Sequence, residues 1–247
     1  AAKALTDEPL YQGEPILAIA AVDEATAAAA LELVELDLQP LPFVVDPLAS
    51  LRPGGPNARL EGNAFVDGTL TTVKWPAEVF AAAPDGTLPT GSHGTTWSYG
   101  DVDAGFATAA LVLDETFHTP ATHHQPLETR SAMAYWQNGK LFLHGSTQSV
   151  AQTVPNIARM VGIKVEEVVL ISEFTGGGFG SKIPGSGSMA IPALMSKKVN
   201  APCMLRITRE EEHYIGRARA GIFGRAKVGF RKDGRIVFTS VRDGDME

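Results

Sequence analysis

The chain has 247 residues, of which 44% are hydrophobic and 20% charged, a composition typical of a globular protein with a buried core. Its formal net charge is -7, so it has no basic surplus to neutralise the phosphates of a nucleic acid or an anionic membrane. Cys203 is the only cysteine, which excludes an internal disulfide and an iron-sulfur cluster held by this chain alone.

The sequence indicates neither a membrane span nor a secretory leader. No apolar run approaches the ~20 residues of a spanning helix, and the first residues lack a basic start followed by an apolar core. We therefore expect a cytoplasmic location, with neither nucleic acid nor membrane as a partner. The six histidines show no H-E-x-x-H spacing, so we expect no metal held directly by side chains. The chain begins without Met and stops just after an apparent strand, as expected for a piece of a longer polypeptide.

The first third of the chain predicts a β-α-β unit followed by a long connection. Residues 15–22, PILAIAAV, predict a short buried strand, and Asp23 is placed to cap an alanine-rich helix after it. Residues 36–45 contain two prolines and predict an edge or bulged strand. Residues 51–95 are rich in Pro, Gly, Asn and Thr, which indicates a connecting region on the surface.

The rest of the chain contains both helical and extended patterns. Asp101 can cap a short helix, and Asn138-Gly139 is a strong hairpin signal between two alternating runs. The expected helices are residues 101–107, 148–161, 187–199 and 209–216, and the expected strands are residues 110–118, 131–136, 140–146, 168–173, 203–208, 224–230 and 235–241.

A glycine-rich loop, TGGGFGSK from Thr175 to Lys182, follows one of these strands. Glycine can adopt positive φ and lie directly against a large ligand, while successive N–H groups form an anion-binding concavity. The spacing fits neither a phosphate-binding P-loop nor a dinucleotide fingerprint. A tight structural connection and a nucleotide-binding module remain alternatives. The residues expected to face an anionic or densely hydrogen-bonding ligand are Gly176, Gly177, Gly178 and Gly180, with Phe179 at the edge of this site.

Several phrases together resemble one family, the molybdenum-cofactor-binding large subunits of xanthine dehydrogenases and aldehyde oxidoreductases. In the family's order they are ETFHTPATHHQPLET, GSTQSV, TGGGFGSK, ITREEEH and RAKVGFRKDGRI. The resemblance implies a partial α/β hammerhead domain at residues 1–50, a connecting region at residues 51–95, and the N-terminal half of a mixed α+β molybdopterin-binding domain at residues 96–247. This fold is expected to be incomplete at its C-terminus.

The resemblance also implies roles for individual residues. The glycine loop would lie against the pyranopterin, and Gln148 matches the glutamine whose amide approaches a molybdenum oxo ligand. Phe179 matches a phenylalanine beside the substrate. Arg219 lies where purine-oxidising members carry a substrate-orienting arginine, although Arg217 is only two residues away. Ile183 replaces a glutamate of xanthine-oxidising members, so we expect an aldehyde or an aromatic N-heterocycle as substrate.

Each of these residues also has a plainer interpretation. Gln148 would then solvate the start of a helix, Phe179 would belong to the core, and the two arginines would pair with the glutamates at residues 210–212 on a charged surface.

The implied reaction is hydroxylation of an electron-poor carbon with oxygen from water. The implied cofactor is molybdopterin with molybdenum, in its simple form or as the cytosine dinucleotide, with iron-sulfur clusters and FAD on partner subunits or domains. The family's glutamate base has no counterpart here and is expected beyond Glu247, so no catalytic residue is expected within this chain. The remainder of the molybdopterin domain is thus an expected partner. The alternative is a non-catalytic split or degenerate subunit with a role in cofactor storage or assembly.

Overall fold

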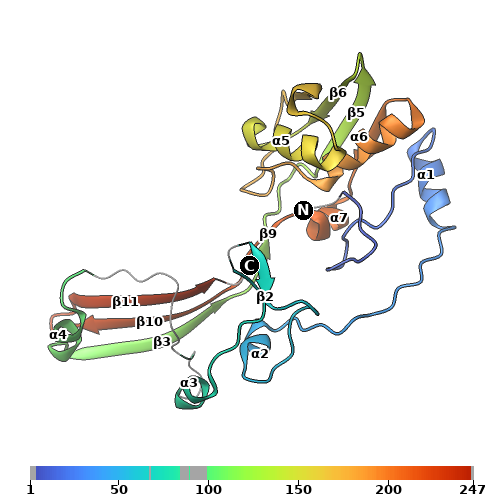
Figure 1. Cartoon of the computed structure of the whole chain (residues 1–247). Coiled ribbons are helices and arrows are strands. Elements are labelled where there is room, and N and C mark those ends of the chain that lie inside the picture. Colours follow the sequence, from blue (N-terminus) through green and yellow to red (C-terminus); the bar gives the residue numbers. More distant parts are fainter. Residues whose placement is uncertain (1–3, 67, 84–88, 90–98, 246–247) are drawn as a thin grey trace. The chain divides into compact units, whose positions relative to one another are not determined.

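The computed structural model describes the chain except for residues 1–3, 67, 84–88, 90–98 and 246–247 (Figure 1). The chain divides into two compact units, and each takes two separate stretches of sequence. The first unit contains residues 1–37 and 123–219, and the second contains residues 38–122 and 220–247. The predicted domain boundaries at residues 50 and 95 stay predictions. None of the helices described is long and apolar enough to cross a bilayer.

The first unit is built on a four-stranded sheet with the order β7-β6-β5-β8. The predicted hairpin is confirmed: Asn138 and Gly139 both have positive φ, 52° and 77°, as a two-residue turn between twisted strands requires. β6 and β7 are parallel, and the connection between them contains a helix. The strands are β5 (Ser131–Gln137), β6 (Lys140–Gly145), β7 (Val168–Ile171) and β8 (Cys203–Arg206).

Two helices pack beside this sheet, as Figure 1 shows, and both match the sequence prediction closely. α5 (Val150–Val161) is capped by the Ser149 hydroxyl and ends at Gly162 in the left-handed conformation. α6 (Gly187–Val199) has the predicted bounds and is followed by Asn200, also left-handed. The alternate residues of β5 and β6 that face the helices are small or aliphatic and fully packed. The shared core contains Ala132, Ala134, Leu141, Leu143, Ile157, Val161, Met189, Ala190 and Ala193.

Shorter elements complete the first unit and lead to and from the sheet. η1 (Val165–Glu167) precedes β7, and α7 (Arg209–Ile215) follows β8 with a capping box between Thr208 and Glu211. β4 (Thr122–His123) pairs with β9 (Ala218–Arg219), so the chain enters and leaves this unit through neighbouring strands.

The N-terminal segment corrects part of the prediction. The helix capped by Asp23 is present as α1 (Glu24–Leu31), but residues 15–22 and 36–45 form no strand, so the predicted β-α-β unit is wrong. A strand needs a neighbour to accept and donate its backbone hydrogen bonds, and among the described residues neither segment has one. Most apolar side chains of residues 36–45 are exposed, with Phe43 at 71%, whereas those of residues 15–20 are half-buried and Ala18 packs against the core.

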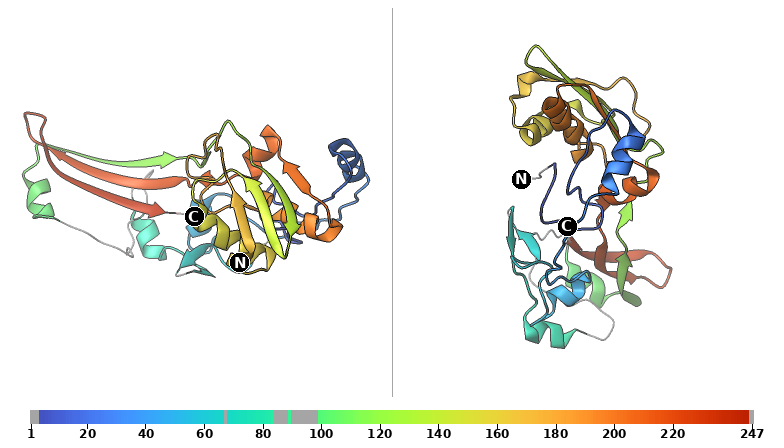
Figure 2. Two further views of the ribbon diagram at one scale, coloured as in Figure 1. Left: turned by 90° about the horizontal axis from the view of Figure 1, so that it is seen from above. Right: turned by 90° about the vertical axis from the view of Figure 1, so that its right-hand side faces the viewer.

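The second unit is dominated by a three-stranded antiparallel sheet with the order β11-β10-β3, whose long strands run side by side in Figure 2. The Arg225 guanidinium on β10 donates to both carboxylate oxygens of Asp114 on β3, at 2.6 and 2.9 Å. The rings of His118 and Phe223 stack across the same pair of strands at 4.1 Å. The bounds are β3 (Leu111–Thr119), β10 (Ile222–Phe230) and β11 (Ile236–Asp245), and all three strands were predicted.

The rest of the second unit contains more structure than its composition suggests. Asp101 caps α4 (Val102–Ala107) as predicted. Within the predicted connecting region the described residues include a small hairpin, which the side chain of Asn63 closes by accepting from and donating to the backbone of Val73. The hairpin consists of β1 (Ala64–Val66) and β2 (Thr69–Thr71), and the nearby helices are α2 (Pro47–Leu51) and α3 (Ala77–Ala82).

Candidate functional site

The glycine loop lies between the end of β7 and the start of α6, and its backbone has two distinct parts. Gly177 and Gly180 have φ of 92° and 104°, and Phe179 between them has φ of 54°, so left-handed backbone occurs here as expected. Gly176 and Gly178 do not have positive φ. They are small for a steric reason: a Cβ on Gly176 would lie 2.6 Å from Glu128 Cβ.

Gln148 holds the second half of the loop. Its side-chain oxygen Oε1 accepts hydrogen bonds from the amides of Gly180 at 3.0 Å and Lys182 at 3.2 Å. Its own backbone N–H donates to the Lys182 carbonyl at 3.0 Å. Since the carboxamide oxygen is occupied by two donors, the orientation of the group is fixed and the NH₂ is left as a donor toward other groups. A Cβ on Gly178 would lie 2.3 Å from that oxygen, so Gly178 lies against the Gln148 side chain.

Glu128 holds the first half of the loop. Its Oε2 accepts from the Gly176 amide at 2.6 Å and from the buried Lys182 ammonium at 2.8 Å, and the Glu128 carbonyl accepts from the same ammonium. Burial of the carboxyl would raise its pKa, but the bonds from Lys182 and Gly176 outweigh this effect and hold the pKa of Glu128 below its ordinary value. The carboxylate therefore stays charged and joins the two ends of the loop.

A second ion pair lies two residues further along the chain. The Arg130 guanidinium pairs with Glu212 of α7, and both side chains are buried, at 4% and 0% exposure. Arg130 also donates to the Ser181 carbonyl at 2.6 Å, and its backbone N–H donates to Glu212. The Ser181 amide and hydroxyl in turn bond to the Gly178 carbonyl. The loop is therefore held before any ligand binds by residues just before β5 and α5 and, through Arg130, by Glu212 of α7.

Some donors of the loop are left without a partner. Within the described part of the chain, the amides of Gly177, Gly178 and Phe179 donate to no protein acceptor. Gly178 is itself buried, where an unpaired backbone N–H is costly. Three successive free amides beside the NH₂ of Gln148 form a set of donors suited to a large ligand rich in anionic and carbonyl oxygens, such as a molybdopterin.

The structure brings Arg219 to the loop but not Ile183. Phe179 is 60% exposed, and its carbonyl accepts a hydrogen bond from the Arg219 guanidinium at 3.1 Å. Arg217 instead presents its carbonyl to His124 Nδ1 at 2.6 Å. The Ile183 carbonyl accepts from the Thr153 hydroxyl of α5 at 3.0 Å, and no described contact joins Ile183 to Phe179. The substrate roles of these residues stay predictions.

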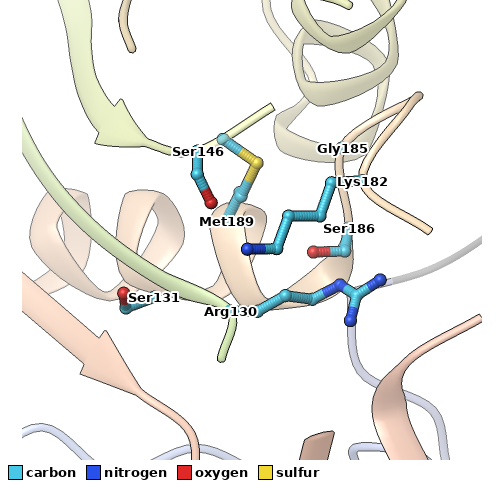
Figure 3. A pocket seen from close by; sticks show the side chains of 7 residues that line it. All are labelled: Arg130, Ser131, Ser146, Lys182, Gly185, Ser186 and Met189. Carbon is cyan, nitrogen blue, oxygen red and sulfur yellow. The ribbon is translucent and has the colours of Figure 1, made fainter. Parts of the chain in front are cut away.

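A small pocket next to the loop is lined by Lys182 and Arg130, the two buried cations that bond to the loop and its neighbours. Figure 3 shows the Lys182 and Arg130 side chains in it, and its space suffices for about one water molecule. Both cations are already paired with Glu128 and Glu212, so the pocket has no free charge to bind an anion. Its lining residues are Arg130, Ser131, Ser146, Lys182, Gly185, Ser186 and Met189.

A histidine cluster lies next to the second ion pair. His123 Nδ1 accepts from the Gln125 amide at 3.0 Å, and its ring stacks on that of His213 with centroids 5.4 Å apart. His123 Nε2 is buried and has no partner among the described residues. Burial lowers the pKa of His123, so the ring is neutral near pH 7. Within the described ranges, no group of three His, Cys, Asp or Glu side chains is suited to hold a metal ion.

The family of the chain follows from its match to a family model. Residues 85–243, more than half of the chain, match the molybdopterin cofactor-binding domain, and the chain belongs to that family.

More particularly, the chain is a molybdenum-cofactor-binding subunit of the xanthine dehydrogenase and aldehyde oxidoreductase family, or a part of one. It is 28% identical over 243 residues to the probable hypoxanthine oxidase XdhD of Escherichia coli strain K12, covering 92% of this chain and 25% of the relative. It is 32% identical over 187 residues to the carbon monoxide dehydrogenase large chain of Afipia carboxidovorans, covering 72% of this chain and 21% of the relative. The chain thus spans about a quarter of the length of these relatives.

Solved structures show the same fold. The chain matches a Cu,Mo-CO dehydrogenase with a TM-score of 0.69 at 25% identity, over 97% of this chain and 29% of the other. Quinoline 2-oxidoreductase from Pseudomonas putida 86 matches with a TM-score of 0.68 at 21% identity, over 90% of this chain and 25% of the other. These likenesses confirm the predicted α+β class.

Sequence reasoning missed the residues that fix the loop. Glu128, Arg130 and Glu212 were not predicted as site residues, and Lys182 entered only as part of the loop's spacing. One signal was present: Glu128 and Arg130 stand at alternate positions just before the run AMAYW at residues 132–136, and a charged side chain next to a buried strand needs a partner.

Proposed function

We propose that this chain forms the loop side of a molybdopterin-binding site in a larger hydroxylase that oxidises aldehydes or N-heterocycles with oxygen from water. When bound, the cofactor supplies the two-electron oxidation and the transfer of oxygen to carbon. The chain's own contribution is to bind the cofactor and to present one edge of the substrate pocket. The single observation that carries the proposal is the set of free amides from Gly177 to Phe179 beside the fixed carboxamide of Gln148.

In this proposal the donors act as a preorganised surface. The Gln148 NH₂ and the three loop amides donate to the oxygen-rich edges of the cofactor, and they need no reorientation on binding because Gly180 and Lys182 already hold Gln148 in place. Gly176 and Gly178 let the loop backbone lie close to Glu128 and Gln148, since a Cβ there would lie 2.6 Å from Glu128 Cβ or 2.3 Å from Gln148 Oε1.

The substrate side is proposed from Phe179. Its exposed ring is suited to stack on a flat aromatic substrate, and Arg219 holds the Phe179 backbone through the carbonyl. Ile183 offers no carboxylate to bind the polar edges of a purine, which favours aldehydes and simple heterocycles. The base, the iron-sulfur clusters and the flavin are proposed to come from partner subunits or from the rest of the molybdopterin domain, with a cytosine dinucleotide as one form of the cofactor.

A non-catalytic subunit that stores or delivers the cofactor is the second candidate. The same donors would serve it equally well, so binding cannot distinguish the two functions. Turnover distinguishes them: the complex purified from its host, with measured molybdenum content, is assayed with benzaldehyde and quinoline and an artificial electron acceptor. Turnover in proportion to molybdenum supports the hydroxylase, whereas molybdenum without turnover of either class supports storage.

A further inference from the structure

Glu128 has no role in the proposed function, yet it is the only carboxylate in the described part of the chain that contacts the glycine loop. Its Oε2 accepts from both the Gly176 amide and the Lys182 ammonium, which are six residues apart in sequence. Since one oxygen joins both ends, the intervening residues 177–181 are closed into a ring by a charge-assisted contact.

Lys182 makes this contact costly to break. Its side chain is 2% exposed, and Glu128 supplies both of its described acceptors, the carbonyl and the carboxylate. Removing the carboxylate would leave a buried ammonium without a counter-charge, which is far less favourable than losing an exposed pair. The contact therefore has one strongly preferred geometry.

The same contact decides which amides remain for a ligand. Gly176 N–H is engaged by Glu128 at 2.6 Å, and the amides of Gly180 and Lys182 are engaged by Gln148. Ser181 N–H donates to the Gly178 carbonyl at 2.9 Å. The ends of the loop are satisfied within the protein, and the middle three amides are not.

We propose that Glu128 is a positioning residue that closes the glycine loop through Lys182 and thereby reserves the amides of Gly177, Gly178 and Phe179 for the cofactor. The closure itself is a property of the protein without ligand. The reservation rests on the proposed function, because it requires that the loop bind the cofactor.

The test is amide hydrogen exchange at single-residue resolution on the purified protein with the partners it retains, prepared with and without the molybdenum cofactor. Glu128→Ala and Lys182→Met each remove one side of the closure. Glu24→Ala is the matched control, because it removes an ion pair of similar length to Arg206 that is exposed and lies elsewhere in the same unit.

In cofactor-free protein, Gly176 is expected to exchange at least about tenfold faster in Glu128→Ala and Lys182→Met than in the wild type, with no change in Glu24→Ala. The double variant Glu128→Ala/Lys182→Met is expected to be no faster than Glu128→Ala alone, because the two residues act as one contact. Unchanged exchange at Gly176 in both single variants would overturn the closure. Exchange that rises across the whole sheet would also overturn it, because Glu128 would then act on global stability.

The cofactor-loaded wild type separates this inference from the proposed function. Slower exchange at Gly177, Gly178 and Phe179 on loading, with Gly176 already slow, supports both. If Gly176 behaves as expected but loading leaves the middle three amides unchanged, the closure stands and the proposed binding surface is wrong.

Discussion

Replacing Gly178 by valine is expected to abolish cofactor retention, and the structure gives the reason. The first atom added, Cβ, would lie 2.3 Å from Gln148 Oε1 and 2.7 Å from Cδ, far inside contact distance. The backbone at Gly178 does not have positive φ, so conformational strain does not contribute. The Gln148 carboxamide must move, and the two hydrogen bonds from Gly180 and Lys182 are lost with it.

The size of the effect follows from those bonds. Each is worth about 0.5–1.5 kcal/mol, so their loss costs about 1–3 kcal/mol of preorganisation, equivalent to about 5- to 150-fold in cofactor affinity. Gly178→Ala should show this loss alone. Valine adds two methyl groups to the space that the pterin is proposed to occupy and should leave no retained cofactor.

The assay is molybdenum and pterin content of each purified variant, with Gly187→Ala as the control because a Cβ there meets only the Ala4 carbonyl at 3.5 Å. In a Gln148→Ala background, Gly178→Ala should have no further effect, since the side chain it displaces is absent. Wild-type cofactor content in Gly178→Val would refute the reasoning and remove the loop from the site.

Three further predictions concern specificity, stability and pH. Ile183→Glu should raise kcat/KM for xanthine relative to benzaldehyde by about tenfold in the complete enzyme, because a carboxylate can bind the polar edges of a purine. Glu212→Gln should lower the free energy of unfolding by about 3–5 kcal/mol in a denaturant titration, because it leaves Arg130 buried without its counter-charge. The melting temperature should be highest above pH 6.5 and should fall as the pH drops below it, because the pKa of His123 is lower in the folded protein and the unfolded chain then binds more protons. The pKa of Glu128 is lowered too, so a second decline should follow below pH 4.5.

Each of these has its own contrary result. A wild type that prefers xanthine, with no change in Ile183→Glu, would show that this position does not set specificity. Glu24→Gln, which removes an exposed pair, should lower the free energy of unfolding by at most about 1 kcal/mol. An equal loss for Glu212→Gln would mean that the buried pair contributes no more to stability than an exposed one. His123→Asn should remove the decline just below pH 6.5, and its persistence would assign that decline to another group.

Local signals in the sequence predicted most elements of the fold. Asn138-Gly139 places the hairpin, and Asp23 and Asp101 cap helices, because turns and caps depend on residues next to each other in the chain. The two predicted strands at residues 15–22 and 36–45 failed because an apolar run becomes a strand only beside a partner.

The candidate site was predicted in part, for the same physical reason. The glycine loop and Gln148 carry signals in their own sequence, and the structure brings them into contact. Glu128 lies 54 residues from Lys182, and Glu212 lies 82 residues from Arg130, so nothing local to either pair indicates its contact. Positive φ was expected of the loop glycines and occurs at Gly177 and Gly180, whereas Gly178 is small because Gln148 lies against it.

The central claim is that the glycine loop of this chain binds molybdopterin, and the most direct measurement is the stoichiometry of molybdenum and pterin in the protein purified from its host. The account predicts about one molybdenum and one pterin per chain in the wild type and in Gly187→Ala, and neither in Gly178→Val. A wild type free of both, or equal content in all three proteins, would contradict it.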